Sequence, residues 1–287
     1  MNDTSTPART QLELWDGATG QAWVDNQILL DAMLQPFEDL LVDTPAAAGA
    51  AQVLDIGCGT GAVARAIARR LGPDGRCVGV DISTPMIAGA AARSDDPRLS
   101  FVCADAQTHA FAAESFDLLV SRFGVMFFTE PETAFANLRR AARAGATLRC
   151  VAWRSAEENP FMTTAERTAA PLLPDLPPRR ADAPGQFAFG DAARVRGILE
   201  RSGWSAIDIR PIERVCHLPA RSLATYVSRL GPVGLALQRA DEATRTRVVA
   251  AVRAAFDGFV HGEDVRFTAA CWLIEARAGA ATVTAHV

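Results

Sequence analysis

The stretch Val53-Leu-Asp-Ile-Gly-Cys-Gly-Thr-Gly61 decides the fold. Residues 52–56 form a short apolar run typical of a buried strand, and three closely spaced glycines follow it. Glycine adopts backbone conformations that other residues avoid and lets a ligand approach the chain closely. Residues 60–71 then carry apolar side chains at helical spacing, ended by Gly72-Pro73. The pattern predicts a strand that leads through a glycine-rich turn to a helix N-terminus, with Asp55 placed to accept a hydrogen bond.

Two more acidic residues follow predicted strands. Asp81 closes the apolar run 77–82, about twenty residues beyond the glycines, where a carboxylate can accept both hydroxyls of a ribose. Asp105, in Ala104-Asp105-Ala106, follows the predicted strand 99–103 and can accept a hydrogen bond from the exocyclic amine of an adenine. The three segments together predict a site for an adenosine-containing ligand at the carboxyl edge of a sheet.

Strands and helices alternate from about residue 50 to 153. Ser83 is expected to cap a helix that has Pro85 near its start, and a further helix is predicted over 130–142. Strands are predicted over 116–121 and 146–153. Because most of these strands are apolar throughout, they indicate a mainly parallel sheet covered by helices on both faces. The expected fold class is α/β, a Rossmann-like sheet of seven mostly parallel strands with an N-terminal helical lid and helical cap insertions.

The flanking segments indicate one core with insertions rather than two independent domains. Residues 10–42 show amphipathic helical patterns, 154–190 are rich in proline, and 221–258 contain two or three helical patterns. Strands are expected near 207–212 and over 265–276. The predicted segments are an N-terminal lid (1–48), the cofactor-binding core (49–153), a cap insertion (154–190), a continuation of the core (191–220), a helical cap insertion (221–262), and a final strand with the tail (263–287).

Composition excludes several classes of protein. The chain of 287 residues is 49% hydrophobic and 22% charged, which is typical of a folded globular protein and not of a disordered one. It contains no lysine and one tyrosine, Tyr226, so a Schiff-base lysine, a P-loop lysine and a catalytic Tyr/Lys pair are all ruled out. The net charge of −4 and the absence of a basic run argue against a nucleic-acid partner.

Further patterns bear on location and metals. The sequence has no apolar run of 18 residues and no secretory signal at its N-terminus, so we expect a cytoplasmic protein without membrane insertion. None of the six cysteines is spaced for a metal knuckle or a redox pair, so they are interpreted as buried thiols of a reducing compartment, and no metal site is expected. The oligomeric state, monomer or homodimer, is left open.

Two cofactors fit the glycine-rich stretch. The pattern Gly57-x-Gly59-x-x-Ala62 satisfies a dinucleotide fingerprint, so a nicotinamide-dependent oxidoreductase has to be considered. The acidic residue two positions before the first glycine and the third glycine at position 61 belong instead to the Asp-x-Gly-x-Gly-x-Gly loop of class I S-adenosylmethionine-dependent methyltransferases. The chain also resembles this family in Gly79-Val-Asp-Ile-Ser83, in Ala104-Asp105-Ala106 and in Phe116-Asp-Leu-Leu-Val-Ser-Arg-Phe-Gly124. This last block is similar to the ubiquinone/menaquinone-biosynthesis branch of small-molecule methyltransferases.

The resemblance covers residues 50–153, and it implies S-adenosyl-L-methionine as the cofactor. It implies that Gly57 and the region of Ser121 lie near the amino-acid end of the ligand. Asp81 and Ile82 would lie at the ribose, and Asp105 and Ala106 at the adenine. The predicted cofactor contacts are completed by Asp55, Cys58, Gly59, Gly61, Met86 and Trp23.

Methyl transfer from a sulfonium has an activated leaving group, so proximity and orientation supply much of the acceleration and a general base is needed only for some acceptors. Arg122, directly after the fourth predicted strand, is the candidate catalytic residue, because it could orient an anionic or carbonyl-bearing acceptor; a salt bridge to a helix is the alternative role. The predicted acceptor pocket is aromatic and contains Trp15, Phe123, Phe127, Trp153, Phe161 and Tyr226. For these aromatics ordinary core packing is the alternative.

Three hypotheses about function remain open. The leading one is methyl transfer to a small, partly hydrophobic organic acceptor, with carbon favoured over oxygen or nitrogen as the receiving atom. The second is a nicotinamide-dependent oxidoreductase, which the absence of lysine disfavours. The third is a relative that binds the cofactor without catalysis.

Overall fold

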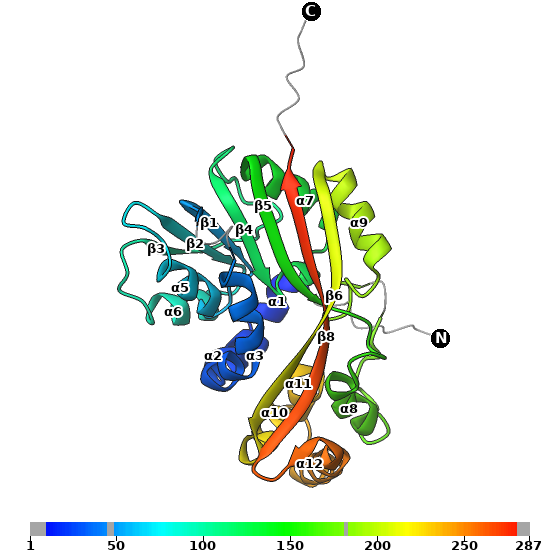
Figure 1. Cartoon of the computed structure of the whole chain (residues 1–287). Helices are drawn as coiled ribbons and strands as arrows, with labels where there is room; N and C mark the ends of the chain where they lie inside the picture. The colour runs from blue at the N-terminus through cyan, green and yellow to red at the C-terminus, as the bar shows by residue number, and fades with distance from the viewer. Residues whose placement is uncertain (1–9, 45–48, 181–182, 280–287) are drawn as a thin grey trace, which may run out of the picture.

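Five parallel strands form the half of the sheet that contains the glycine-rich stretch (Figure 1). The computed structural model describes residues 10–44, 49–180 and 183–279. Residues 1–9 of the predicted lid and residues 280–287 of the predicted tail lie outside the described residues. The strands lie in the order β3-β2-β1-β4-β5. Their bounds are β1 (Gln52–Ile56), β2 (Arg76–Asp81), β3 (Leu99–Cys103), β4 (Phe116–Arg122) and β5 (Ala142–Trp153). The central strands β1 and β4 are buried on both faces, which explains their continuous apolar sequence.

Two antiparallel strands complete the sheet. β8 (Asp264–Ala278) lies between β5 and β6 (Trp204–Pro219) and is antiparallel to both, and it confirms the strand expected over 265–276. The strand predicted over 207–212 is much longer in the structure. β6 is the edge strand, and exposed residues such as Asp208, Arg210 and Pro211 interrupt its apolar pattern, so the sequence did not indicate its full length. A short strand, β7 (Val260–His261), pairs with β8, so the sheet has eight strands where seven were expected.

Helices cover both faces of the sheet, as the apolar strands predict. α7 (Pro131–Ala141) and α9 (Ala192–Arg201) pack together on one face, where the indole nitrogen of Trp204 donates a hydrogen bond to the carbonyl oxygen of Phe135 at 3.0 Å. α5 (Ala62–Ala68) and α6 (Thr84–Ala91) follow β1 and β2. η1 (Val125–Phe127) is a short 3-10 turn after β4. The carboxyl ends of the parallel strands therefore meet the turns that lead into α5, α6 and η1.

The third N-terminal helix belongs to the core. α1 (Gln11–Trp15) and α2 (Ala18–Asp25) precede α3 (Gln27–Val42), whose apolar residues at helical spacing, including Leu30, Leu34, Phe37 and Leu41, are at most 3% exposed. Its C-terminal end accepts a hydrogen bond at Leu40 from the guanidinium of Arg149 in β5 (3.1 Å). Within the segment predicted as a lid (1–48), α3 packs on the sheet, so a lid remains a prediction for α1 and α2 alone.

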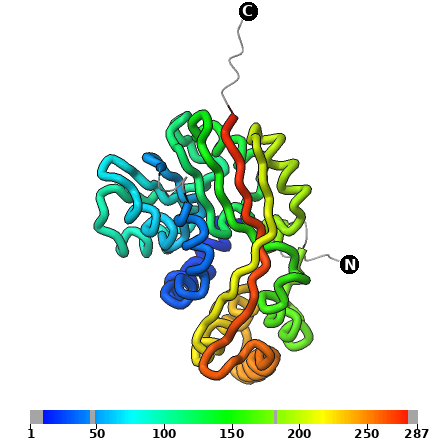
Figure 2. Tube along the Cα trace, viewed as in Figure 1, coloured from blue at the N-terminus to red at the C-terminus, as the bar shows by residue number. Residues whose placement is uncertain are grey.

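A ribbon formed by β6 and β8 extends beyond the sheet and carries the cap (Figure 2). β5 pairs with β8 only as far as Trp153 opposite Cys271, whereas β6 and β8 remain paired to Pro219 opposite Asp264. Around this free ribbon lie α8 (Pro160–Ala169), α10 (Leu223–Arg229), α11 (Gly231–Leu237) and α12 (Glu242–Ala255), with the turns η2 (Ala220–Ser222) and η3 (Asp257–Phe259). The two insertions expected from sequence therefore form one cap, and its helix α11 contacts α2.

Candidate functional site

The glycine-rich loop after β1 has the backbone that the sequence predicts. Gly57, Gly59 and Gly61 all have positive φ angles, of 63°, 53° and 79°. A Cβ atom on Gly57 would lie 2.7 Å from the Cα of Gly124, so two loops approach each other closely here. A Cβ on Gly61 would lie 2.8 Å from the ring of Phe101, so this glycine serves the packing of the helix on the sheet. The positive φ angles favour glycine at all three positions, and at Gly57 and Gly61 the space excludes a side chain as well.

Ser121 holds the two loops together. Its hydroxyl donates to the carbonyl oxygen of Ile56 at 2.8 Å and accepts a hydrogen bond from the backbone N–H of Gly124 at 3.1 Å. The side chain is fully buried. The structure thus gives Ser121 a positioning role behind the glycine-rich loop, with its hydroxyl already bonded on both sides.

Asp81 lies at the end of β2 against the same loop. Its carboxylate accepts hydrogen bonds from the backbone N–H of Gly59 at 2.8 Å and of Ser83 at 3.0 Å, while burial raises its pKa. Ile82, the residue between Asp81 and Ser83, is half-buried. Met86 in the first turn of α6 lies beside the loop, since its sulfur would be 3.6 Å from a Cβ on Gly59. Cys58 is fixed by a hydrogen bond from its N–H to the carbonyl oxygen of Val80 at 3.0 Å.

The loop after β3 lies next to Asp81. The N–H of Ala104 donates to the carbonyl oxygen of Asp81 at 2.9 Å, so the residues that follow both strands share one edge. Asp105 accepts a hydrogen bond from the N–H of Gln107 at 2.9 Å and remains half-buried. The carbonyl oxygen of Ala106 accepts from the side-chain amide of Asn137 at 3.0 Å. The structure therefore brings the predicted ribose and adenine contacts to adjacent loops.

A small cavity lies between the glycine-rich loop and α3. It has a volume of about 40 Å³, and its walls include Asp55, the residues 57–60, Trp23 and Phe123. Asp55 is 1% exposed, and its Oδ2 atom has no hydrogen-bond partner. Burial raises the pKa of Asp55 to about 7, although the nearby charge of Arg122 acts in the opposite direction. A buried carboxylate oxygen without a partner is costly, so this wall of the cavity is suited to a hydrogen-bond donor or a cation.

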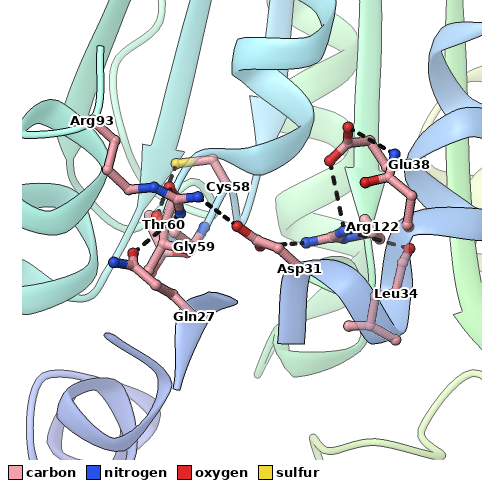
Figure 3. Close-up of polar contacts among 11 residues, drawn as sticks. Gln27, Asp31, Leu34, Glu38, Cys58, Gly59, Thr60, Arg93 and Arg122 are labelled. Carbon is pink, nitrogen blue, oxygen red and sulfur yellow. Dashed lines mark hydrogen bonds and ion pairs between the residues drawn. The ribbon is translucent and has the colours of Figure 1, made fainter. Parts of the chain in front are cut away.

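Arg122 lies on the same cavity wall and faces acidic residues of α3 (Figure 3). Its guanidinium is 3.7 Å from the carboxylate of Asp31 and 4.0 Å from that of Glu38. Asp31 also forms a 2.6 Å ion pair with Arg93, whose second guanidinium nitrogen donates to the carbonyl oxygen of Thr60 at 3.1 Å. The salt bridge to a helix that was the alternative for Arg122 is therefore present.

The sequence interpretation did not include Asp31, Glu38 or Arg93 in the site. A signal for the two acids was present, because Asp31, Leu34 and Glu38 follow the spacing i, i+3, i+7 and so share the apolar stripe of the helix. Acidic residues within a buried stripe require partners. Arg93 offered no comparable pattern, since its contact with Asp31 depends on where the turn after α6 lies relative to α3.

Aromatic residues of the lid lie over the end of β4. The ring of Trp15 is 4.9 Å from that of Phe127 and 6.0 Å from that of Trp23, both edge to face. The backbone of Trp15 is fastened to α6, because the Ser83 hydroxyl donates to its carbonyl oxygen at 2.7 Å. On the other side of the loop, Phe123 stacks on Trp153 at 4.6 Å. These five residues we call the site aromatics.

Phe161 and Tyr226 lie elsewhere. Phe161 stacks on Phe267 of the ribbon with a centroid distance of 3.8 Å and also contacts Phe256, Phe259 and Tyr226 in the cap. The structure therefore does not bring these two residues together with the other predicted acceptor contacts. The group of Phe161, Tyr226, Phe256, Phe259 and Phe267 we call the cap aromatics.

The described part of the chain holds neither a metal-binding cluster nor a membrane-spanning helix. No group of three or more His, Cys, Asp or Glu side chains in residues 10–44, 49–180 and 183–279 is arranged to hold a metal ion. None of the helices in these ranges has the length and apolar character needed to cross a membrane.

Residues 53–145 match a protein-family model described as a methyltransferase domain. A demethylmenaquinone methyltransferase of Roseiflexus sp. strain RS-1 is 39% identical over 100 residues, which are 35% of this chain and 42% of that protein. This chain therefore matches less than half of the length of that relative. The nocamycin O-methyltransferase of Saccharothrix syringae is 28% identical over 186 residues, 61% of this chain and 66% of that protein.

Among solved structures, the [4+2]-cyclase SpnF has a similar fold. Its TM-score is 0.56 at 18% sequence identity, and the alignment covers 94% of this chain and 96% of that one. At this identity the likeness concerns the fold. The family match covers β1 to the first residues of β5, which is a smaller part of the chain than the 94% that the structural alignment covers.

Proposed function

This chain carries a class I S-adenosylmethionine-dependent methyltransferase domain that resembles the menaquinone-biosynthesis branch, and on that premise we propose that it methylates a small, partly hydrophobic organic acceptor. S-adenosyl-L-methionine is the proposed cofactor. Bound there, it supplies an activated methyl group on a sulfonium. The chain itself contributes the binding surface, the orientation of the two reactants and the exclusion of water.

The observation that carries the proposal is the unpartnered carboxylate of Asp55 beside the glycine-rich loop. Four carboxylates, those of Asp31, Glu38, Asp55 and Asp81, interact in this region with three guanidinium groups, those of Arg65, Arg93 and Arg122. A dinucleotide would bring its anionic pyrophosphate to the start of α5, next to this acidic surplus. A ligand with an ammonium and a sulfonium group suits the same surroundings, so the electrostatics favour S-adenosylmethionine over NAD(P).

The other predicted contacts follow the edge of the sheet in order. Asp81 has lone pairs left after its two backbone hydrogen bonds and is proposed to hold the ribose, with Ile82 and Met86 beside it. Asp105 and Ala106 are proposed to contact the adenine. Because typical ligand pockets measure about 300–1,000 Å³, the 40 Å³ cavity is far too small for the cofactor. Cofactor entry therefore requires α1 and α2 to move away from the loop.

The acceptor is proposed to bind against the site aromatics, below the lid. Trp15 and Phe127 cover the end of β4, and Phe123 and Trp153 form the wall on the side of β5. Tyr226 and Phe161 act through the shape of the cap, whose helix α11 contacts α2. Carbon is the proposed receiving atom, following the resemblance to the menaquinone branch, and oxygen is the alternative because one relative is named an O-methyltransferase. No nucleic-acid partner is proposed.

Ligand binding tests the cofactor. We expect S-adenosylhomocysteine to raise the melting temperature and NAD(P) to leave it unchanged; a ligand at one hundred times its Kd adds about 2.7 kcal/mol to the free energy of unfolding. Asp81→Ala should lower the affinity by about 1.5–3 kcal/mol, while Asp96→Ala serves as the matched control, because Asp96 pairs with Arg98 away from the loop. Stabilisation by NAD(P) alone would reject the proposal.

Turnover has to be measured separately from binding, because one fold can support different activities. The protein is incubated with S-adenosylmethionine labelled with ¹³C in its methyl group and with a panel of demethylmenaquinone, phenols and polyketide-type carboxylic acids. The carbon shift of the product separates methyl groups on carbon, oxygen and nitrogen. Binding of the cofactor without methylation of any compound would favour the non-catalytic alternative.

A further inference from the structure

Arg122 is buried but makes only long contacts. Its side chain is 11% exposed, and its guanidinium lies 3.5 Å from the carbonyl oxygen of Leu34, 3.7 Å from Asp31 and 4.0 Å from Glu38 (Figure 3). A guanidinium normally approaches a carboxylate oxygen to about 2.7–2.9 Å. The five N–H groups of Arg122 are therefore held near acceptors without close hydrogen bonds.

Arg93 belongs to the same network and, unlike Arg122, forms close hydrogen bonds. It pairs with the other oxygen of Asp31 at 2.6 Å and donates to Gln27 and to the carbonyl oxygen of Thr60, each at 3.1 Å. Both guanidinium groups face the same carboxylate, and only that of Arg93 approaches it closely. The loose contacts of Arg122 are thus a property of its position rather than of the shared acid.

Arg122, whose contacts are all long, and the unpartnered Oδ2 atom of Asp55 lie on one cavity. Both residues line it together with Gly57, Cys58 and Gly59. One wall therefore offers a cation that lacks a close acceptor and a carboxylate oxygen that lacks a donor. A ligand group that satisfies both carries a positive and a negative charge a few atoms apart, as the α-amino-acid end of the cofactor does.

We propose that Arg122 binds the α-carboxylate of the cofactor, and that Asp31 and Glu38 are positioning residues that hold the guanidinium at the cavity until the ligand replaces their long contacts. This inference rests on the proposed function, and it assigns Arg122 to the cofactor instead of the acceptor. Since Asp31 and Glu38 belong to α3, the same contacts connect the occupied site to the helix under the lid.

The test compares two ligands that differ only in the carboxylate. S-adenosylhomocysteine and its decarboxylated form, S-adenosyl-3-thiopropylamine, are titrated calorimetrically into the wild type, Arg122→Gln and Arg93→Gln. The wild type should prefer S-adenosylhomocysteine by about tenfold or more, as expected for a charge-assisted pair. Arg122→Gln should lose this preference, and Arg93→Gln should keep it even where both affinities fall.

Retention of the preference by Arg122→Gln would overturn the inference, and so would the absence of a preference in the wild type. If Arg122→Gln does not fold, Arg122→Lys replaces it: a reduced preference supports the assignment, and an unchanged preference overturns it, because lysine cannot form the two parallel hydrogen bonds of a guanidinium. A wild type that binds neither ligand would reject the proposed function itself, which distinguishes that failure from failure of the assignment.

Discussion

The site aromatics and the cap aromatics are similar in composition and differ in their surroundings. The cap aromatics pack on one another around Phe161 and Phe267, which are 2% and 5% exposed. Two of the site aromatics, Trp23 and Phe123, line a cavity whose wall also includes a carboxylate oxygen without a partner and a loosely held arginine. Aromatic side chains that are satisfied by one another stabilise a fold, whereas aromatics beside unsatisfied charges can complete a ligand site.

The two groups are also connected to the sheet differently. The site aromatics follow the carboxyl ends of β4 and β5 or come from the lid that is fastened to α6. The cap aromatics surround the free end of the ribbon, where Asn159 binds both the N–H and the carbonyl oxygen of Ala270 at 2.9 Å. Substitutions in the cap should therefore affect stability most, and substitutions near the loop should affect ligand binding most.

The largest expected effect concerns Phe161. Replacement by alanine removes the stacking on Phe267 and leaves a cavity among the cap aromatics, so we expect the free energy of unfolding to fall by about 3–5 kcal/mol. Urea denaturation measures this change. Affinity for S-adenosylhomocysteine, measured where the variant is still folded, should remain within about twofold of the wild type.

Phe259→Ala is the matched control for Phe161, because Phe259 belongs to the same group but is only half-buried. Its effect on stability should be smaller. A Phe161→Ala variant with wild-type stability and weakened ligand binding would contradict the division into two aromatic groups.

The second effect concerns Gly57. Alanine here must adopt a positive φ, at about 1–2 kcal/mol, and its Cβ would meet Gly124 at 2.7 Å. We expect lower stability and at least a roughly tenfold loss of affinity for S-adenosylhomocysteine, since the loop must shift.

Gly145→Ala separates strain from site geometry, because Gly145 has a φ of 78° and open space around its Cβ position. This variant should lose comparable backbone stability and keep its affinity. Equal losses of affinity in both variants would show that strain alone, rather than the loop, determines binding.

The third effect is a dependence on pH. With the pKa of Asp55 raised to about 7 from its ordinary value of 3.8, the folded state holds a proton that the unfolded state releases, so the free energy of unfolding should fall as pH rises from about 4 to 7. A cationic ligand group needs the ionised carboxylate, so affinity for S-adenosylhomocysteine should rise between about pH 6 and 8.

Asp55→Asn should weaken the dependence of stability on pH, to which Asp81 with its raised pKa also contributes, and should remove the dependence of affinity; denaturation and titration series over this pH range measure both. The neighbouring charges of Arg122, Asp81 and Glu38 remain in that variant, which isolates the contribution of Asp55. Wild-type affinity that is constant from pH 6 to 8 would mean that Asp55 does not contact the charged part of the ligand.

The smallest effect concerns the lid. Trp15→Ala removes the ring contacts with Phe127 and Trp23, each worth about 0.5–1.5 kcal/mol, so affinity should fall by roughly three- to tenfold with little change in global stability. Isothermal titration measures it. Trp15→Phe should retain most of the affinity, and an alanine variant with unchanged binding would remove the lid from the site.

The sequence by itself determined the parallel half of the sheet and the loop after β1. Apolar strands, caps and glycines act locally, and the spacing from Asp55 to Asp81 to Asp105 follows from one strand–helix unit after another, so these residues could be placed without a tertiary structure. The same local logic predicted the final strand from its continuous alternating pattern, and the pairing of β8 with β5 and β6 makes it antiparallel.

Only the tertiary structure decided which distant side chains share the site. Asp31 meets Arg93 and Arg122 because α3 packs beside α5 and faces both the residues that follow α6 and the end of β4, and no local pattern specifies that contact. Phe161 and Tyr226 belong to the cap because the ribbon of β6 and β8 continues beyond the sheet. The sequence did not indicate the length of this ribbon, because charged residues interrupt the apolar pattern of β6. Local propensity and periodicity are properties of neighbouring residues, whereas burial and charge pairing depend on contacts between residues far apart in the chain.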